Sequence, residues 1–101
     1  MMMNTHELAQ ELVLALGDAK ELPYPVLKAR TLASLYHFYR DDIRLLRGMT
    51  SSAQFHTVFS DLRHQDEIAR RVRRGKPFYF LTAAGQAHYD ALDALFLMDA
   101  D

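Results

Sequence analysis

The feature that most constrains this chain is a strand-forming stretch interrupted by the sequence Arg74-Gly75-Lys76. β-branched and aromatic residues, which favour strands, lie on both sides of it. Gly75 can adopt a positive φ angle without steric cost, so it suits a tight turn. Pro77 has no N–H group and therefore fits the start or the outer edge of a strand. We predict a β-hairpin with strands at residues 68–73 and 78–81.

Helices are predicted on both sides of this hairpin. Phe55, Val58, Phe59 and Leu62 follow the i, i+3, i+4, i+7 spacing of a helix with one buried face. The segment after the hairpin, residues 83–98, also has a helical apolar pattern. Its apolar surface is wider than one small domain needs, which is typical of a helix that contacts another subunit.

The first half of the chain predicts further helices. Leu8, Leu12, Val13 and Leu16 form an apolar stripe in an N-terminal helix within residues 1–22, with Gly17 as its expected end. A second helix begins near Pro25, because proline suits a first helical turn. A short third helix follows Asp41 and Asp42, which are better explained as an N-cap and a partner of the helix dipole than as catalytic carboxylates. Gly48 ends it, and Thr50 or Ser51 caps the next helix.

A short helix, a tight turn and a longer helix form a helix-turn-helix. Together with the hairpin, they resemble the second half of a winged helix-turn-helix domain. The motifs that carry this resemblance are Phe55-x-x-Val58-Phe59-x-x-Leu62 and Tyr79-Phe80-Leu81-Thr82-x-x-Gly85. The second is similar to the "LTxxG" junction of the multiple-antibiotic-resistance-type and phenolic-acid-type repressors. Those families usually place a glycine before the first wing strand, whereas this chain has Gln65-Asp66-Glu67, where Asp66 can adopt the left-handed region at some cost.

The resemblance implies a mainly α fold with a small β-hairpin (α+β), a winged helix-turn-helix with an extra N-terminal helix. We expect one domain, since 101 residues support a single core. Residues 1–22 would be the accessory helix, 25–85 the helix-turn-helix and wing, and 83–98 the C-terminal helix.

Charge is distributed unevenly along the chain, although the net charge is only −1. Residues 40–76 carry nine basic and five acidic groups, whereas residues 77–101 carry four aspartates and no basic group. The hairpin concentrates five cations within seven residues: Arg70, Arg71, Arg73, Arg74 and Lys76. Phosphate or a narrow minor groove would satisfy such a cluster. Alternatively, Arg70 or Arg71 could face the opposite side of the strand and pair with Asp66, Glu67 or an acidic C-terminal residue.

The helix at residues 52–64 supplies the other half of a DNA-binding surface. Donors and acceptors on its outer face could distinguish base edges in a major groove. We expect Gln54 to pair with adenine, and Arg63 with guanine or a phosphate. The complete predicted set comprises Ser51, Ser52, Ala53, Gln54, His56, Thr57, Ser60, Arg63, Arg70, Arg71, Arg73, Arg74 and Lys76. An ordinary solvated helix face is the alternative.

The chain shows little sign of other chemistry. It has no cysteine, which excludes a disulfide and a cysteine-based zinc site, and its five histidines are dispersed without an HExxH motif. We therefore expect no enzyme activity, metal or cofactor. No apolar run is long enough to cross a bilayer and no secretory signal is present, so we expect a cytoplasmic protein that does not contact the membrane.

The resemblance implies a sequence-specific DNA-binding transcriptional regulator that binds double-stranded DNA as a small homodimer, formed through its N-terminal and C-terminal helices. The alternative is a winged-helix protein-interaction module, an adaptor or an inhibitor of a nucleic-acid machine, that does not itself read DNA. In that case the basic hairpin would bind an acidic protein surface.

Overall fold

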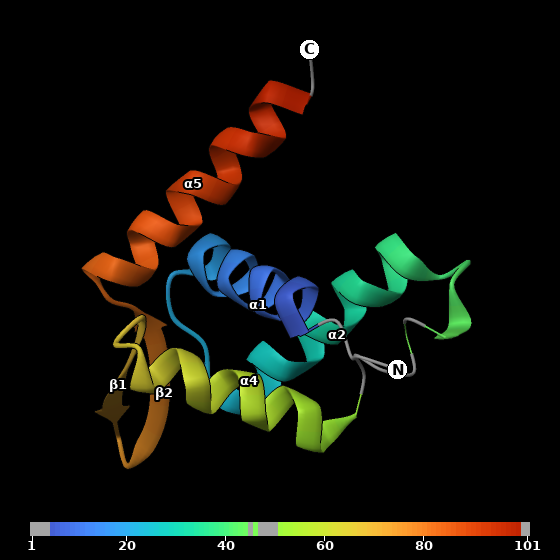
Figure 1. Ribbon diagram of the computed structural model, residues 1–101. Coiled ribbons are helices and arrows are strands. Elements are labelled where there is room, and N and C mark those ends of the chain that lie inside the picture. Colours follow the sequence, from blue (N-terminus) through green and yellow to red (C-terminus); the bar gives the residue numbers. More distant parts are fainter. Residues whose placement is uncertain (1–4, 45, 47–50, 100–101) are drawn as a thin grey trace.

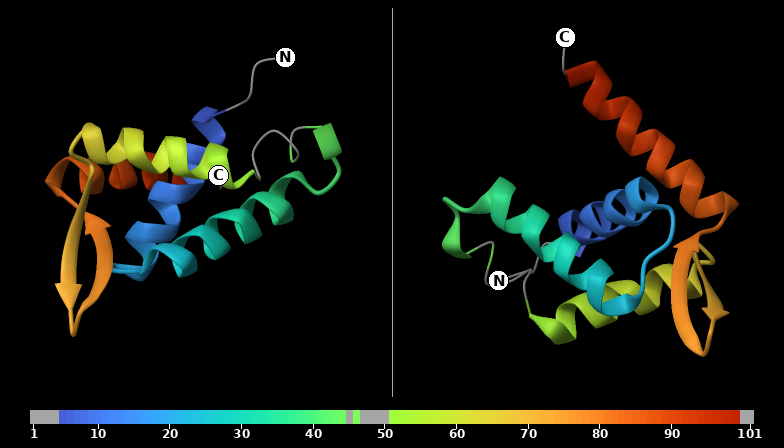
Figure 2. Two further views of the ribbon diagram at one scale, coloured as in Figure 1. Left: turned by 90° about the horizontal axis from the view of Figure 1, so that it is seen from below. Right: turned by 180° about the vertical axis from the view of Figure 1, so that it is seen from behind.

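The computed structural model describes residues 5–44, 46 and 51–99. Its elements are α1 (Thr5–Ala19), α2 (Tyr24–Tyr39), α4 (Ser52–His64), β1 (Ile68–Arg73), β2 (Lys76–Leu81) and α5 (Ala83–Asp99). Helices α1, α2 and α4 pack together, the β1–β2 hairpin lies beside the C-terminal end of α4, and α5 extends away from the other helices (Figure 1). The views from below and behind show the same placement of the hairpin (Figure 2).

The short helix predicted between α2 and α4 is described only in part. Ile43, Arg44 and Leu46 are helical, whereas Leu45 and residues 47–50, including the predicted stop at Gly48, lie outside the described residues. The cap of the next helix is settled, because the Ser51 hydroxyl accepts a hydrogen bond of 3.0 Å from the Gln54 N–H group. Ser51 therefore satisfies one of the unpaired N–H groups that begin any helix.

The core confirms the predicted apolar stripes. Leu8, Leu12, Val13 and Leu16 of α1 are fully buried, as is Phe55 of α4. The remaining core side chains come from all the other elements and include Leu27, Leu35, Val58, Phe59, Leu62, Ile68, Tyr79 and Leu92. This core fixes the orientation of α4 and of the hairpin beside it, because both contribute residues to it.

The N-terminal helix does not end at Gly17, as the sequence analysis expected. It continues to Ala19, and the next residue, Lys20, has a positive φ angle of 75°. Gly17 instead lies inside the helix, where a Cβ atom would be 2.1 Å from a ring carbon of Tyr89 on α5. The glycine is therefore a close-packing residue between two helices.

The hairpin has a two-residue turn, so β2 begins earlier than predicted. Arg73 pairs with Lys76 across the turn, and both Arg74 and Gly75 have positive φ angles, of 52° and 76°. Two such residues form a type I′ turn, which matches the twist of the strands. Pro77 is accommodated because its nitrogen faces the outer edge of β2.

That outer edge is paired by one residue from the loop between α1 and α2. The Leu22 N–H group donates to the Tyr79 carbonyl (3.0 Å), and the Tyr79 N–H group donates to the Leu22 carbonyl (2.8 Å). The loop therefore adds a single bridging residue to the two-stranded sheet and joins it to the helices.

The corner before β1 has no glycine, and Asp66 adopts the conformation that a glycine would usually take there. Asp66 has a φ angle of 60°, which is the left-handed conformation that the sequence analysis required of it. The N–H groups of Glu67 and Asp66 donate to the carbonyls of Leu62 (2.9 Å) and Arg63 (3.0 Å). This is the Schellman pattern of helix termination. Helix α4 therefore ends at a fixed angle to the wing.

No helix in the described ranges has both the length and the apolar character needed to cross a membrane.

Candidate nucleic-acid interface

Helix α4 presents a polar face to solvent. Ser51, Ser52, Ala53, His56, Thr57 and Arg63 are exposed, and Ser60 is half-buried. The Thr57 hydroxyl donates to the Ala53 carbonyl (3.0 Å). The outward face predicted for this helix is confirmed at these positions.

Gln54 is the exception, and its predicted position was wrong. Gln54 is only 7% exposed, so it lies on the buried side of α4. Residues four positions apart lie on one helical ridge, and Gln54 shares such a ridge with buried Val58 and Leu62. Because glutamine is polar, the burial of Gln54 could not be predicted from the sequence. A side chain buried here cannot reach an adenine in a groove.

Lys28 is an additional cation that the sequence analysis did not identify. It lies on α2, and its Nζ donates to the Ser52 hydroxyl oxygen at 2.5 Å. This contact brings a positive charge to the N-terminal end of α4, where the helix dipole already favours anions. No local sequence signal marks Lys28, because only the packing of α2 against α4 brings the two residues together.

The two faces of the wing differ in what they contact. The ring of Tyr79 packs edge-on against Phe59 of α4, with ring centroids 4.9 Å apart. Tyr79 and its cross-strand partner Arg70 therefore lie on the face that meets α4. Because side chains alternate along a strand, Arg71 and Arg73 lie on the opposite face.

The arginines on that opposite face already have partners within the protein. The guanidinium of Arg71 lies over the ring of Phe80, 4.7 Å from its centroid. Arg73 forms an ion pair with Glu21 at 3.0 Å. The alternative of pairing with a carboxylate, which we considered for Arg70 and Arg71, is therefore found at Arg73 and with Glu21. Lys76, opposite Arg73 in the register, is exposed beside the turn residue Arg74.

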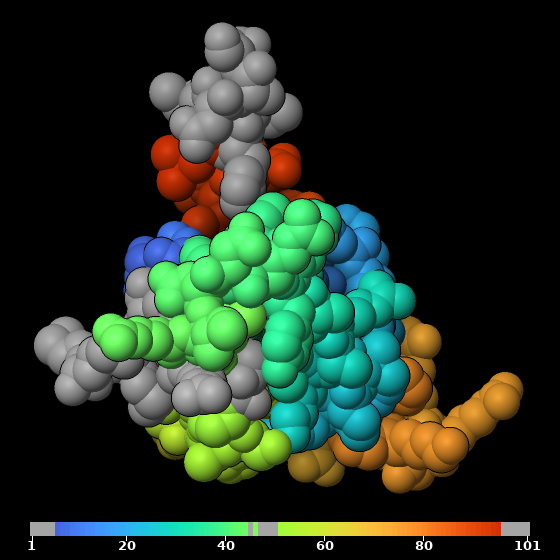
Figure 3. All heavy atoms as spheres, turned by 90° about the vertical axis from the view of Figure 1, so that its right-hand side faces the viewer, coloured from blue at the N-terminus to red at the C-terminus, as the bar shows by residue number. Residues whose placement is uncertain are grey.

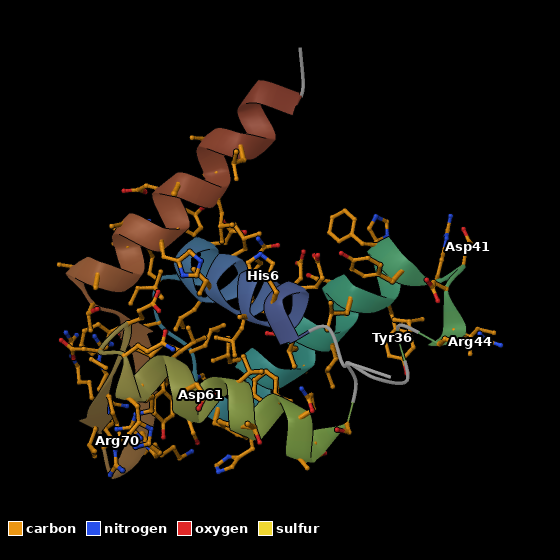
Figure 4. The ribbon with its side chains drawn as sticks, viewed as in Figure 1. His6, Tyr36, Asp41, Arg44, Asp61 and Arg70 are labelled. Carbon is orange, nitrogen blue, oxygen red and sulfur yellow. The ribbon has the colours of Figure 1, made fainter. Side chains whose placement is uncertain are left out.

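On the side that faces α4, the cations remain accessible. Arg63 lies over the ring of Tyr79, 5.5 Å from its centroid, so an aromatic ring supports its guanidinium. An open hollow of about 430 Å³ lies beside it, lined by Ser60, Arg63, His64, Asp66 and Ile68. Arg70 extends from the hairpin at this end of the molecule, far from Arg44 at the other end (Figure 4).

The wing projects from the molecular body. In the space-filling view it extends outward beyond the surface formed by α2 and α4 (Figure 3). Arg74 and Lys76 at its tip are exposed and, with Arg73 and Phe78, line a hollow of about 640 Å³. A projecting cationic hairpin beside an exposed polar helix face can contact an extended polyanion at two places at once.

The described residues contain no group of three or more histidine or acidic side chains arranged to hold a metal ion. His88 forms a 2.7 Å contact between its Nδ1 and the Glu67 carboxylate. That contact joins α5 to the corner before β1 and is part of the scaffold.

Comparison with known proteins supports the architecture. No protein-family model matches the chain, and no match is found among curated proteins. Among solved structures, the chain is similar to the crystal structure of SSV1 F-93, with a TM-score of 0.64 and 18% sequence identity. The similarity covers 91% of this chain and 89% of that chain. The predicted winged-helix fold is thereby confirmed.

Proposed function

We propose that this protein is a sequence-specific DNA-binding transcriptional regulator. One observation carries the proposal: an exposed polar face on α4 lies beside a projecting cationic hairpin, and Arg63 and Arg70 lie where the two meet. A B-form major groove admits a helix of this kind, and basic side chains on the hairpin can contact the neighbouring backbone or minor groove. The protein would act by binding rather than by catalysis.

The structure changes which residues we assign to each part of that interaction. On α4, the side chains available to base edges are Ala53, His56, Thr57 and Arg63, together with the partly exposed Ser60. Gln54 is withdrawn from the set because it is buried. On the wing, Arg70 and Arg74 are the foremost phosphate-binding candidates, and Lys28 joins them at the N-terminal end of α4.

We also propose that the protein acts as a dimer of the kind suggested by its resemblance to the multiple-antibiotic-resistance-type and phenolic-acid-type repressors. Helix α5 extends beyond the body (Figure 1) and exposes 57% of Leu95. Phe38 on α2 is 60% exposed, and with Leu14 of α1 and Asp93 of α5 it lines a hollow of about 300 Å³. A second copy seated there would cover these apolar side chains. Two subunits would then read half-sites about one helical turn apart.

Titration of a random-sequence DNA duplex at several salt concentrations tests DNA binding. Contact with roughly four to six phosphates per subunit predicts a steep, linear fall of log affinity with log salt. Selection of bound oligonucleotides from a random pool then tests sequence preference. A salt-independent or undetectable interaction with duplex would favour the protein-interaction module instead.

Matched charge variants test the site. Replacing both Arg70 and Arg74 by alanine should weaken binding to all duplexes alike, roughly tenfold, and should reduce the salt slope by about 2. Arg30→Ala removes one exposed guanidinium from α2, outside the proposed surface, and should leave the slope unchanged. If the double variant of Arg70 and Arg74 had no larger effect than Arg30→Ala, the wing would not be part of the interface.

A further inference from the structure

The outer half of the wing receives little support from the rest of the protein. Its residues 71–73 and 76 and 77 are exposed, and only Phe78 is half-buried. The backbone bridge to Leu22 occurs at Tyr79, in the half nearer the body. A two-stranded hairpin is at best marginally stable by itself in water. Something must therefore hold the tip at a defined angle if it is to meet DNA in a defined way.

An ion pair between Arg73 and Glu21 reaches the outer half of the wing from the body of the protein. The two charged groups are 3.0 Å apart, and the Glu21 side chain is only 18% exposed, whereas Arg73 is 57% exposed. The other carboxylate oxygen of Glu21, Oε1, is buried without a hydrogen-bond partner among the described residues. A carboxylate so sheltered is less screened by salt than a surface carboxylate. Glu21 is also held in place, because its neighbour Leu22 is hydrogen-bonded to β2.

We propose that Glu21 is a positioning residue for nucleic-acid binding: it holds Arg73 against the body and thereby fixes the wing tip. Arg73 is then an anchoring residue rather than a phosphate ligand, and Arg70 and Arg74 are left to face the DNA. The positioning role depends on the DNA binding proposed above. The anchoring itself does not, and it can be measured in the free protein.

The sign of one substitution distinguishes positioning from simple electrostatics. Removing a negative charge near a cationic surface should strengthen binding to DNA. If Glu21 positions the wing, Glu21→Gln should instead weaken binding, roughly two- to fivefold. Asp41→Asn, which removes one exposed carboxylate just beyond the end of α2, far from Arg70 (Figure 4), should leave affinity unchanged or slightly higher. Tighter binding by Glu21→Gln than by the wild type would overturn the positioning role.

Amide hydrogen exchange in the free protein tests the anchoring without DNA. In Glu21→Gln, exchange at Arg71 and Phe78 in the outer half should become roughly two- to fivefold faster, whereas Ala69 and Phe80 near the body should change little. These are cross-strand pairs of the same hairpin, so the inner pair controls for global unfolding. Combining Glu21→Arg with Arg73→Glu restores an opposite-charge pair and should restore slow exchange.

The DNA-binding measurement and the hydrogen-exchange measurement test different parts of the proposal. Unchanged exchange in Glu21→Gln would overturn the anchoring whatever the protein binds. Absence of duplex binding by the wild type would overturn the proposed function and, with it, the positioning role, while the exchange data would still decide whether Glu21 anchors the wing. Faster exchange in the outer half together with weaker DNA binding would support the proposal in full.

Discussion

Gly85 on α5 lies directly against the backbone carbonyl of Glu67, so close that a Cβ atom at Gly85 would be 2.1 Å from that oxygen. The same carbonyl accepts a hydrogen bond of 3.1 Å from the Thr82 N–H group. The junction from β2 to α5 is therefore packed against the corner from α4 to β1. These two connections set the wing's position relative to the helices.

Gly85→Ala should destabilise the protein. Alanine is a better helix former than glycine by about 1 kcal/mol, but here its Cβ would force apart two backbone segments. We expect a net loss of about 1–3 kcal/mol in the free energy of unfolding, measured by chemical denaturation. A variant as stable as the wild type would show that α5 can shift without cost.

Gly17→Ala should also destabilise the protein, but by a mechanism that a second substitution relieves. The atoms that a Cβ at position 17 would contact too closely belong to the Tyr89 ring rather than to the backbone. We expect Gly17→Ala combined with Tyr89→Ala to be no less stable than Tyr89→Ala alone. Comparison of the four proteins by thermal denaturation forms a double-mutant cycle. Purely additive effects would contradict direct contact between the two sites.

Gln54→Ala should change stability rather than base preference. The side chain is buried in the ridge that contains Val58 and Leu62, so its loss affects packing. Thr57→Ala, on the exposed face, should have little effect on stability and should relax preference at a position in the bound sequence. Oligonucleotide selection with both variants measures this. If Gln54→Ala changed the sequence preference and Thr57→Ala did not, Gln54 would have to be counted among the DNA-contacting residues.

The stability of the protein should fall in strongly alkaline solution, where Tyr39 and Tyr89 lose their phenolic protons. The pKa of Tyr39 is raised from 10.0 to about 12, by burial and by its hydrogen bond of 2.7 Å to Glu7. The pKa of Tyr89 is raised to about 12 by its hydrogen bond to Asp18, with a smaller effect of burial.

Because the folded state holds these protons more tightly than the unfolded state, stability should decrease as the pH rises from about 10 to about 12. Denaturation across this range measures the effect, and tyrosinate absorbance should show tyrosines that titrate late, Tyr39 and Tyr89 among them. Replacing both Tyr39 and Tyr89 by phenylalanine should flatten the decrease. An equally steep decrease in that double variant would assign it to other groups.

Leu95→Glu should separate the proposed dimer into monomers while leaving the fold intact. The residue is 57% exposed on the projecting helix, so a carboxylate there is solvated in the monomer but would be buried in a dimer. Sedimentation analysis measures the oligomeric state. Ile43→Glu, at a site that is 62% exposed but distant from α5 in sequence, is the control. If the wild type is itself monomeric at all concentrations, dimerisation through these helices is wrong.

Much of the fold could be predicted because its local signals agree with one another. The apolar stripe of α4 has a helical period, Arg74-Gly75 forms a turn, and Pro77 tolerates only an outward-facing position. Each of these follows from bonds and sterics within a few residues. The acidic corner at Asp66 departed from the expected glycine, yet the physical requirement for a positive φ angle still identified the conformation.

What the sequence determined by itself, then, was the order and type of the elements and the concentration of cations on one hairpin. Tertiary structure alone decided which of those cations already has an acidic partner within the protein, because Glu21 and Arg73 are 52 positions apart and meet only when the chain folds. It also decided that Gln54 is inside, that Lys28 reaches α4, and that Gly17 is a packing residue. Local propensity acts over neighbouring residues, whereas burial and ion pairing depend on which distant segments the core brings together.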